Sequence, residues 1–197
     1  MGTNEQVMTW IKDTYHNVKG ENDINAAGCC TGKFISQGGI CGRAESTGLG
    51  VYYATRTLLD TKSFVDKAGL SLGIKDKTFI VQGFGAVGYW ASHFIEKDGG
   101  KITTVVEYNS AIHNPAGLDV NDVKNWMVKN GTLANYPKAK EATDSNPTAY
   151  LTKFSADCMI PAATEKSLHA GNANDLKVKA IFEGANGPTT YKAEQIF

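Results

Sequence analysis

The 197-residue sequence has no long hydrophobic run and no block of charges of one sign. Since no apolar stretch approaches the length that a helix needs to cross a bilayer, we expect no membrane segment. Lys plus Arg and Asp plus Glu both number 20, so the formal net charge at pH 7 is zero. A surface for nucleic acid or anionic lipid requires a local excess of Lys and Arg, which this sequence lacks.

Cysteine and histidine are also few and form no metal-ligand pattern. The four cysteines lack the spacing of zinc ligands, and the four histidines are scattered along the chain, so we expect no metal site. The adjacent pair Cys29-Cys30 does not suggest a disulfide framework. We therefore expect reduced, buried thiols in an intracellular protein. The first residues resemble neither a signal peptide nor an Arg-rich transit peptide.

The most informative stretch runs from Lys77 to Glu107 and contains a glycine motif between two predicted strands. Residues 78–81 are β-branched and aromatic, as in a buried strand, and lead directly into Gly83-x-Gly85-x-x-Gly88. Apolar residues then recur at helical spacing, and a second predicted strand over 102–106 ends at Glu107, nineteen positions after Gly88. This strand–turn–helix–strand order predicts dinucleotide binding. S-adenosylmethionine binding, which also uses a glycine turn and an acid, remains an alternative on this motif alone.

Each part of the motif has a physical role in holding a dinucleotide. Gly83 permits the tight turn, Gly85 lets the backbone approach the pyrophosphate, and Gly88 allows the helix to pack on the strand. The free N–H groups of the following helix then face the phosphates. Glu107 can accept hydrogen bonds from the adenine ribose and would repel a 2′-phosphate, so the sequence predicts NAD in preference to NADP. No Arg follows Glu107 to oppose this preference. The predicted cofactor contacts in this stretch are Gly83, Phe84, Gly85, Ala86, Val87, Gly88 and Glu107.

Helices and strands alternate along the rest of the chain. At the N-terminus, Thr3 and Gln6 predict a capping box for a helix that ends at Gly20. Residues 21–42 read as an irregular glycine-rich loop, which we expect its apolar side chains to anchor: Phe34, Ile35 and Ile40. Ser46 or Thr47 is then expected to cap a helix with a buried stripe of Val51, Tyr52, Thr55, Leu58 and Leu59.

Beyond Glu107, Asp119 is expected to cap a short helix that Gly131 ends. Residues 132–155 are polar and predict irregular structure. Two further strands are expected over 156–161 and 178–182. Strands that alternate with helices predict an α/β fold of the Rossmann type, with a doubly wound and mostly parallel sheet.

Five short segments spread along the chain carry a resemblance to a known family. They are Gly32-Lys-Phe-Ile-Ser-Gln-Gly-Gly-Ile-Cys-Gly-Arg43, Ser46-Thr-Gly-Leu-Gly50, Gln82-Gly-Phe-Gly-Ala-Val-Gly88, Ile160-Pro-Ala-Ala163 and Glu183-Gly-Ala-Asn-Gly-Pro-Thr189. In this order they resemble the hexameric glutamate dehydrogenases over essentially the whole chain. Five ordered motifs are far more specific than one glycine turn, and they exclude the methyltransferase alternative.

The resemblance implies further site residues. It assigns Arg43 to the substrate carboxylate, although on local sequence alone a surface salt bridge is the commoner role of such an Arg. It assigns Thr47 to the nicotinamide amide, and it places Ala162, Ala163 and Asn186 along the cofactor cleft. The catalytic Lys and Asp of the family align before Met1, so no catalytic residue is expected in this chain. Residues 1–45 would then be the end of a substrate domain, and 46–197 most of a cofactor domain from a longer enzyme.

By resemblance, the parent enzyme deaminates L-glutamate oxidatively to 2-oxoglutarate and ammonia and transfers hydride to NAD or NADP. It is expected to be a homohexamer of the mitochondrial matrix, or otherwise of the cytoplasm, with no nucleic-acid or membrane partner. Two alternatives stay open. The isolated chain could be a dinucleotide-binding module without turnover, because proton transfer needs a positioned acid or base. The parent could also be a sister dehydrogenase acting on leucine, valine or phenylalanine.

Overall fold

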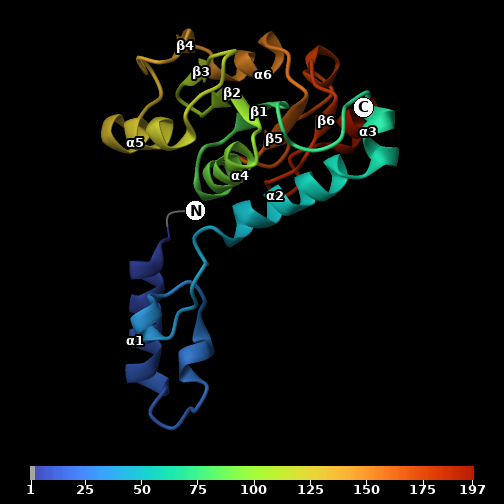
Figure 1. Cartoon of the computed structure of the whole chain (residues 1–197). Helices are drawn as coiled ribbons and strands as arrows, with labels where there is room; N and C mark the ends of the chain where they lie inside the picture. Colours follow the sequence, from blue (N-terminus) through green and yellow to red (C-terminus); the bar gives the residue numbers. More distant parts are fainter. Residues whose placement is uncertain (1–2) are drawn as a thin grey trace. The chain divides into compact units, whose positions relative to one another are not determined.

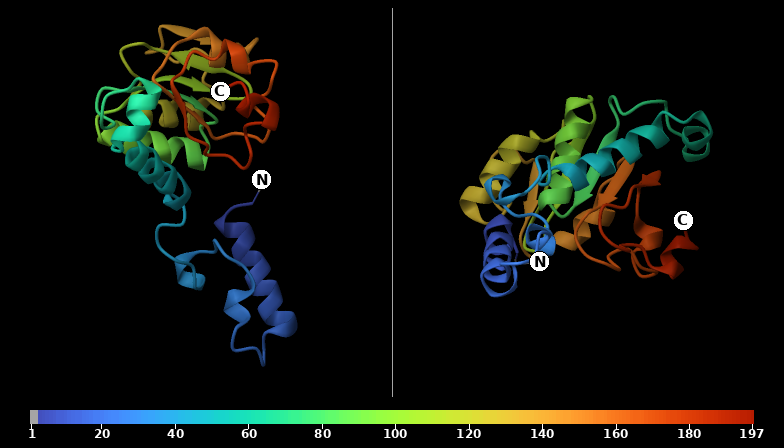
Figure 2. Two further views of the ribbon diagram at one scale, coloured as in Figure 1. Left: turned by 90° about the vertical axis from the view of Figure 1, so that its right-hand side faces the viewer. Right: turned by 90° about the horizontal axis from the view of Figure 1, so that it is seen from below.

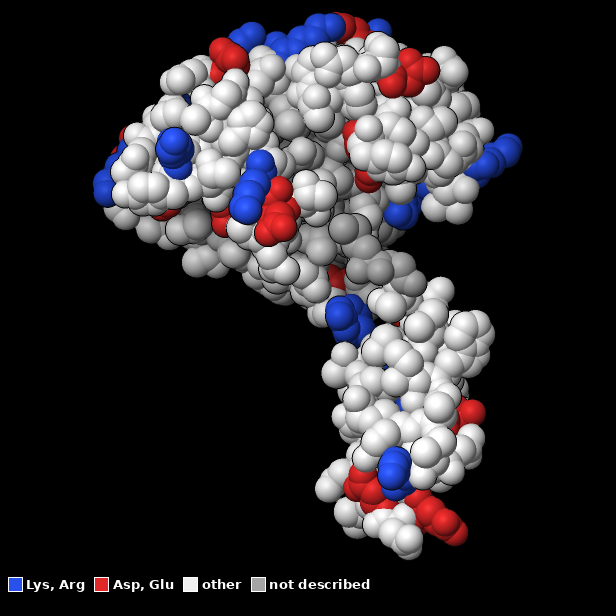
Figure 3. Space-filling model, turned by 180° about the vertical axis from the view of Figure 1, so that it is seen from behind, with Lys and Arg blue, Asp and Glu red and all other residues white. Residues whose placement is uncertain are grey.

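A computed structural model describes residues 3–197 of the chain (Figure 1). The chain divides into two compact units, Met1–Ser46 and Thr47–Phe197. No helix among the described residues is long and apolar enough to cross a membrane. On the face seen in Figure 3, Lys and Arg side chains are interspersed with Asp and Glu.

The first unit consists of helix α1 (Glu5–Lys19) followed by loop segments with two short 3₁₀ turns, Ala26–Cys29 and Ile35–Gln37. The predicted helix is confirmed, but its predicted cap is wrong. Asn4 caps α1 by accepting a 3.0 Å hydrogen bond from the N–H of Val7, because an Asn one position nearer the first turn reaches that donor. Gly20 ends the helix as predicted.

Apolar side chains of the first unit are less buried than the sequence predicts. None of the residues of α1 is buried, and Trp10 and Val18 are 60% and 69% exposed. The expected anchors of the glycine-rich loop are also wrong, since Ile35 and Ile40 are 64% and 75% exposed. Only Ala26, Gly20 and Lys33 of the described part of this unit are buried.

The second unit contains one six-stranded sheet in the order β4-β3-β2-β1-β5-β6. The pairs β1–β2, β1–β5 and β5–β6 are parallel, whereas β2–β3 and β3–β4 are antiparallel. The predicted mostly parallel α/β sheet is therefore confirmed, with an antiparallel edge that the sequence did not reveal. The strands are β1 Thr78–Gln82, β2 Lys101–Val106, β3 Ala111–His113, β4 Glu141–Thr143, β5 Cys158–Pro161 and β6 Ala180–Ile181.

Helices cover both faces of the sheet (Figures 1 and 2). On one face α2, α4 and α5 lie side by side, and α3 follows α2. On the other face lies α6, with the turns around it. The helices are α2 Ser46–Leu59, α3 Lys62–Ala68, α4 Ala86–Lys97, α5 Val120–Asn130, α6 Tyr150–Lys153 and α7 Tyr191–Glu194, with 3₁₀ turns at Pro147–Ala149 and Ala173–Asp175.

The two faces follow from the alternation of side chains along each strand. In β1, Phe79 and Val81 join the larger core cluster under α2, α4 and α5. Ile80 between them points to the other face and joins the smaller cluster with Met159 and Leu168. All three β1 side chains are 0% exposed. The central strand is therefore apolar on both faces, as its sequence predicts.

Several local predictions need correction. Ser46 is the first helical residue of α2 rather than a cap outside it, and Leu58 of the predicted stripe is 39% exposed. Residues 132–155 are not irregular throughout, because they contain β4 and α6 and bury Leu133 and Tyr136 in the larger cluster. Of the four free cysteines, only Cys158 is buried, whereas Cys29 and Cys41 are exposed.

Candidate functional site

The glycine turn between β1 and α4 requires glycine at two positions, at Gly83 for its backbone conformation and at Gly88 for close packing. Gly83 has a φ of +83°, and a side chain there would lie 2.8 Å from the carbonyl oxygen of Ala162. Its N–H donates a 2.7 Å hydrogen bond to the carbonyl of Val106, which ties the turn to β2. At Gly88, a Cβ would lie 1.8 Å from the carbonyl oxygen of Gly83. These contacts hold the first turn of α4 directly on the end of β1.

Gly85 differs from these two glycines because it faces open space. It is exposed, it is the N-cap of α4, and a Cβ built on it would meet no other atom within 4 Å. No side chain caps α4, so the N–H groups of its first turn point outward without a side-chain acceptor. Ala86, the first helical residue, is also exposed. An open helix N-terminus of this kind attracts phosphate through its N–H groups and its dipole.

Glu107 follows β2 and lies against the glycine turn. Its Oε1 accepts a hydrogen bond from the backbone N–H of Phe84, whose ring is completely buried. Its own N–H donates to the carbonyl of Ser110 at 2.8 Å, which holds the backbone at the end of the strand. The side chain is half-buried, so an acidic group stands beside the turn at the carboxyl edge of the sheet.

The structure adds a residue that the sequence analysis missed. Lys124, on α5, donates a hydrogen bond of 3.1 Å from its Nζ to the carbonyl oxygen of Phe84. Burial lowers the pKa of this ammonium group, and the negative charge of Glu107 acts in the opposite direction. Glu107 and Lys124 therefore hold the N–H and the carbonyl of the same residue. The signal was hidden because the two side chains are seventeen positions apart and on different elements.

The segments after β5 and β6 reach the same edge of the sheet. The N–H of Ala162 donates to the carbonyl of Gln82 at 2.7 Å, and the backbone of Ala163 lies against Gly83. A side chain on Gly184 would lie 3.1 Å from Cβ of Ala162 and 3.3 Å from Cγ1 of Val87. The site residues predicted after β1, β2 and β5 are thus brought together. Asn186, predicted after β6, is exposed and lies two positions beyond Gly184.

The predicted residues near the start of α2 divide between the two units. Gly48 packs so tightly on α4 that a Cβ would lie 2.8 Å from the carbonyl oxygen of Val87. The exposed Thr47 is therefore brought near the first turns of α4. Arg43 belongs to the first unit, where it is exposed and its carbonyl accepts a hydrogen bond from Oγ of Ser46 at 3.2 Å.

These features fit a dinucleotide. The side-chain oxygen Oε1 of Gln82, at the end of β1, is buried and has no hydrogen-bond partner among the described residues. With the open backbone at Gly85 and the acid at Glu107, it belongs to a set of polar groups at the carboxyl ends of β1 and β2, the edge where α/β sheets bind ligands. No group of three or more His, Cys, Asp or Glu in the described part of the chain could hold a metal ion.

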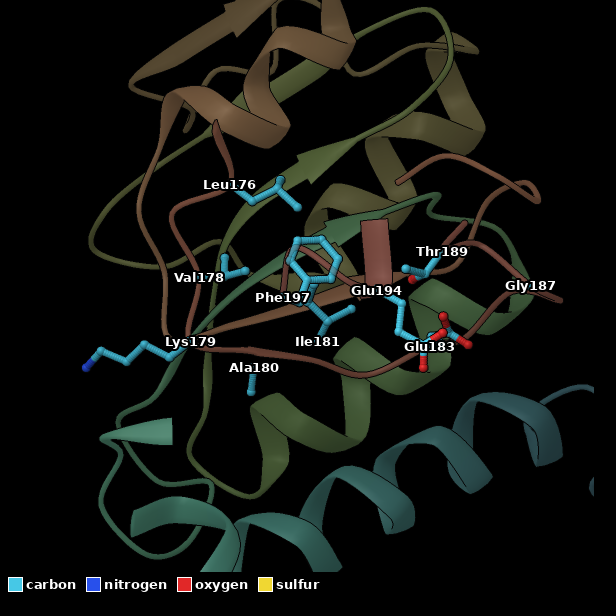
Figure 4. Close-up of a pocket in the computed structure, with 10 residues that line it drawn as sticks. All are labelled: Leu176, Val178, Lys179, Ala180, Ile181, Glu183, Gly187, Thr189, Glu194 and Phe197. Carbon is cyan, nitrogen blue, oxygen red and sulfur yellow. The ribbon is translucent and has the colours of Figure 1, made fainter. Parts of the chain in front are cut away.

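A hollow lies along β6, outside the glycine turn. This cavity of about 570 Å³ is open to solvent along the free edge of β6. None of its lining residues belongs to the turn or to α4, and Lys179 points away from its centre in Figure 4. It is lined by Leu176, Val178, Lys179, Ala180, Ile181, Glu183, Gly187, Thr189, Glu194 and Phe197 (Figure 4).

The sheet order, the glycine turn and the acid after β2 define an α/β protein of the Rossmann type. The model of the Glutamate/Leucine/Phenylalanine/Valine dehydrogenase family matches residues 38–197. The chain therefore belongs to this family of amino-acid dehydrogenases.

Several curated relatives of this chain are named glutamate dehydrogenases. The mitochondrial glutamate dehydrogenase of Dictyostelium discoideum is 44% identical over 196 residues, which cover 100% of this chain and 38% of the relative. Glutamate dehydrogenase of Thermotoga maritima is 38% identical over 197 residues and is covered to 44%. The crystal structure of the hetero-hexameric glutamate dehydrogenase from Thermus thermophilus, in a Leu-bound form, superposes with a TM-score of 0.80 at 29% identity, covering 99% of this chain and 42% of that chain. The chain thus spans about two fifths of the length of these relatives.

Proposed function

We propose that this chain is the cofactor-binding part of a glutamate dehydrogenase, which converts L-glutamate to 2-oxoglutarate and ammonia. The observation that carries the proposal is the open N-terminus of α4 at Gly85 with Glu107 fixed beside it. The cofactor, when bound, accepts the hydride from the substrate carbon. Relatives named glutamate dehydrogenase favour glutamate over leucine, valine or phenylalanine as the substrate.

In this proposal the chain's own residues bind and orient the cofactor. The first-turn N–H groups of α4, from Ala86 to Gly88, bind the pyrophosphate, and Phe84 buries its ring to hold the turn rigid. Glu107 accepts hydrogen bonds from the adenine ribose with the oxygen that Phe84 leaves free, which favours NAD over NADP. Thr47 is assigned to the nicotinamide amide. Val87, Ala162, Ala163 and Asn186 line the cleft between these ends.

In this proposal the first unit contributes to substrate binding. We assign residues 1–45 to the substrate domain and 46–197 to the cofactor domain, and Arg43 to the substrate carboxylate, since a guanidinium binds carboxylate with two parallel hydrogen bonds. The acid–base pair that moves protons is assigned to other parts of the enzyme. The 197-residue chain by itself is therefore proposed to bind cofactor without turnover.

The assembly and the compartment of the whole enzyme are also proposals. We propose a hexamer, since a solved relative is described as hetero-hexameric. That its six subunits are identical rests on the resemblance to the hexameric glutamate dehydrogenases alone. We propose the mitochondrial matrix because the relative from Dictyostelium discoideum carries "mitochondrial" in its name. Mass photometry of the full-length protein tests the first statement, and microscopy of a tagged full-length protein tests the second.

The test of the cofactor site is a fluorescence titration of the chain with NADH and with NADPH. We expect saturable NADH binding that is tighter than NADPH binding. Replacing Glu107 with Ala should narrow this gap, because the ribose loses an acceptor and the 2′-phosphate loses a repelling charge.

A second variant separates binding from folding. In Gly85→Ser the new hydroxyl is a good N-cap, so the melting temperature should stay the same or rise. The same hydroxyl occupies the approach of the pyrophosphate and competes for its N–H donors, so NADH affinity should fall by about tenfold. Unchanged NADH affinity in a folded Gly85→Ser chain would contradict the proposed site, as would the absence of NADH binding in a wild-type chain that melts cooperatively.

A further inference from the structure

The contact of Lys124 with the glycine turn is not used by the proposed cofactor site. Its Nζ lies 3.1 Å from the carbonyl oxygen of Phe84, and the N–H of the same residue is bonded to Glu107. The ammonium also lies 5.3 Å from the centre of the Tyr89 ring on α4. Lys124 is half-buried, so its position is fixed by these contacts rather than free in solvent.

The positive charge of Lys124 lies close to the carboxylate of Glu107, which is proposed to select against NADP. A carboxylate beside the adenine ribose discriminates against a 2′-phosphate by repulsion between like charges. The 2′-phosphate carries close to two negative charges at neutral pH and presents strong acceptor oxygens. A lysine held beside the same residue as Glu107 offsets the repulsion and offers an N–H donor to those oxygens. Sequence order hides this pairing, since no basic residue directly follows Glu107.

We propose that Lys124 is a specificity-determining residue which lets the cofactor site accept the 2′-phosphate of NADP despite Glu107. The inference rests on the proposed cofactor function and deepens it. Glu107 sets the preference for the free ribose, and Lys124 reduces the size of that preference. The preference between NAD and NADP is then set by two side chains of opposite charge. Glu107 accepts a hydrogen bond from the N–H of Phe84, and Lys124 donates one to its carbonyl oxygen.

A purely structural role is the competing explanation. By donating to the carbonyl of Phe84, Lys124 also ties α5 to the turn, and its loss could loosen the site for every cofactor. A structural role affects NADH and NADPH alike, because both share the pyrophosphate and the nicotinamide. A role in specificity changes the affinity for NADPH and leaves that for NADH almost unaltered.

The experiment is a titration of the whole chain and its Lys124→Met variant with NADH and NADPH at low and high salt. Methionine keeps the length and apolar stem of the side chain and removes the charge. We expect NADPH affinity to fall by about tenfold, the usual range for a hydrogen bond to a charged group, and NADH affinity to change by less than about twofold. The loss for NADPH should shrink at high salt, since screening weakens the contact between the two charges.

Two further variants act as controls. Lys129→Met removes an exposed lysine of the same helix and should leave both affinities unchanged. Lys124→Arg keeps the charge and should retain NADPH binding. Equal weakening of both cofactors in Lys124→Met, or no weakening of either, would overturn the inference while the proposed function stands. If the folded wild-type chain binds neither cofactor, both the proposed function and the inference fail.

Discussion

Gly88 lies so close to the carbonyl of Gly83 that any side chain there must move α4 or β1. A Cβ would be 1.8 Å from that oxygen, far inside contact distance. We expect Gly88→Ala to lower the free energy of unfolding by about 2–4 kcal/mol, because the backbone of a packed strand and helix must shift. Urea denaturation measures this loss. A midpoint equal to that of the wild-type chain would show that the helix can slide at little cost.

The buried imidazole of His113 leads to a prediction on how the stability of the chain depends on pH. Its ring is buried between Phe154, 3.6 Å away between ring centres, and Thr104, whose hydroxyl oxygen lies 2.8 Å from Nδ1. Burial lowers the pKa of the imidazole below its usual value, against the pull of the nearby Glu141 carboxylate. The unfolded chain therefore binds this proton more readily than the folded one.

The sign of the effect follows from this difference. The contribution of His113 to stability is complete above the unfolded pKa of about 6.5 and is lost as the pH falls below it. The free energy of unfolding should therefore decrease between neutral and mildly acidic pH, and the decrease should be smaller in His113→Gln. Urea midpoints measured along a pH series check this. An identical pH dependence in the two proteins would assign the decrease to other groups.

At the residue scale, the sequence predicts those candidate site residues that lie within one continuous stretch of the chain. The glycine turn and Glu107 could be located because strand, turn, helix and acid follow one another directly. Lys124 could not, since only the packing of α5 beside α4 brings it to Phe84. The cap of α1 was misplaced by one residue because Thr3 and Asn4 are both good caps and only the geometry chooses between them.

At the scale of elements, the close packing of α2 on α4 depends on one glycine, Gly48, which has no side chain. A Cβ on Gly48 would lie 2.5 Å from Cβ of Trp90, whereas one on Gly50, in the same helix, would meet nothing within 4 Å. We expect Gly48→Ala to destabilise the chain by about 2–3 kcal/mol. Gly50→Ala should stabilise it by about 0.5–1 kcal/mol through helix propensity alone. Thermal or urea unfolding of both variants compares them, and a loss of stability in both would indicate that α2 resists substitution for another reason.

The elements that were predicted well have strong local periodicity. β1, β2, α4 and α5 carry buried side chains at strand or helix spacing, and caps such as Asp119 mark their ends. The antiparallel pair β3 and β4 was missed because each strand has only three residues and the second is largely exposed. Their pairing depends on contacts between residues about thirty positions apart, which local composition does not encode.

At the scale of the molecule, the sheet unit holds both apolar core clusters. Among the described residues, no member of either cluster precedes Tyr52, and the two clusters include every described strand except β4. We therefore expect residues 46–197 alone to unfold cooperatively and to bind NADH within about threefold of the full chain, since the proposed dinucleotide contacts all lie there. Calorimetry and NADH fluorescence of this shorter chain test the prediction. A shorter chain without a cooperative transition would show that the first unit contributes to the stability of the sheet.

The burial of Cys158 makes its rate of chemical modification a measure of how often the sheet opens. This thiol in β5 is 0% exposed, and burial raises its pKa to about 12, whereas Cys29 and Cys41 are open to solvent. A thiol reagent added to the native chain should modify the exposed pair at once and Cys158 only when the sheet opens. A bound cofactor stabilises the folded sheet. It should therefore slow the modification of Cys158, and the slowing should grow with the fraction of chains that hold cofactor. The rate at which the buried thiol disappears then reports cofactor binding without any optical signal from the cofactor itself.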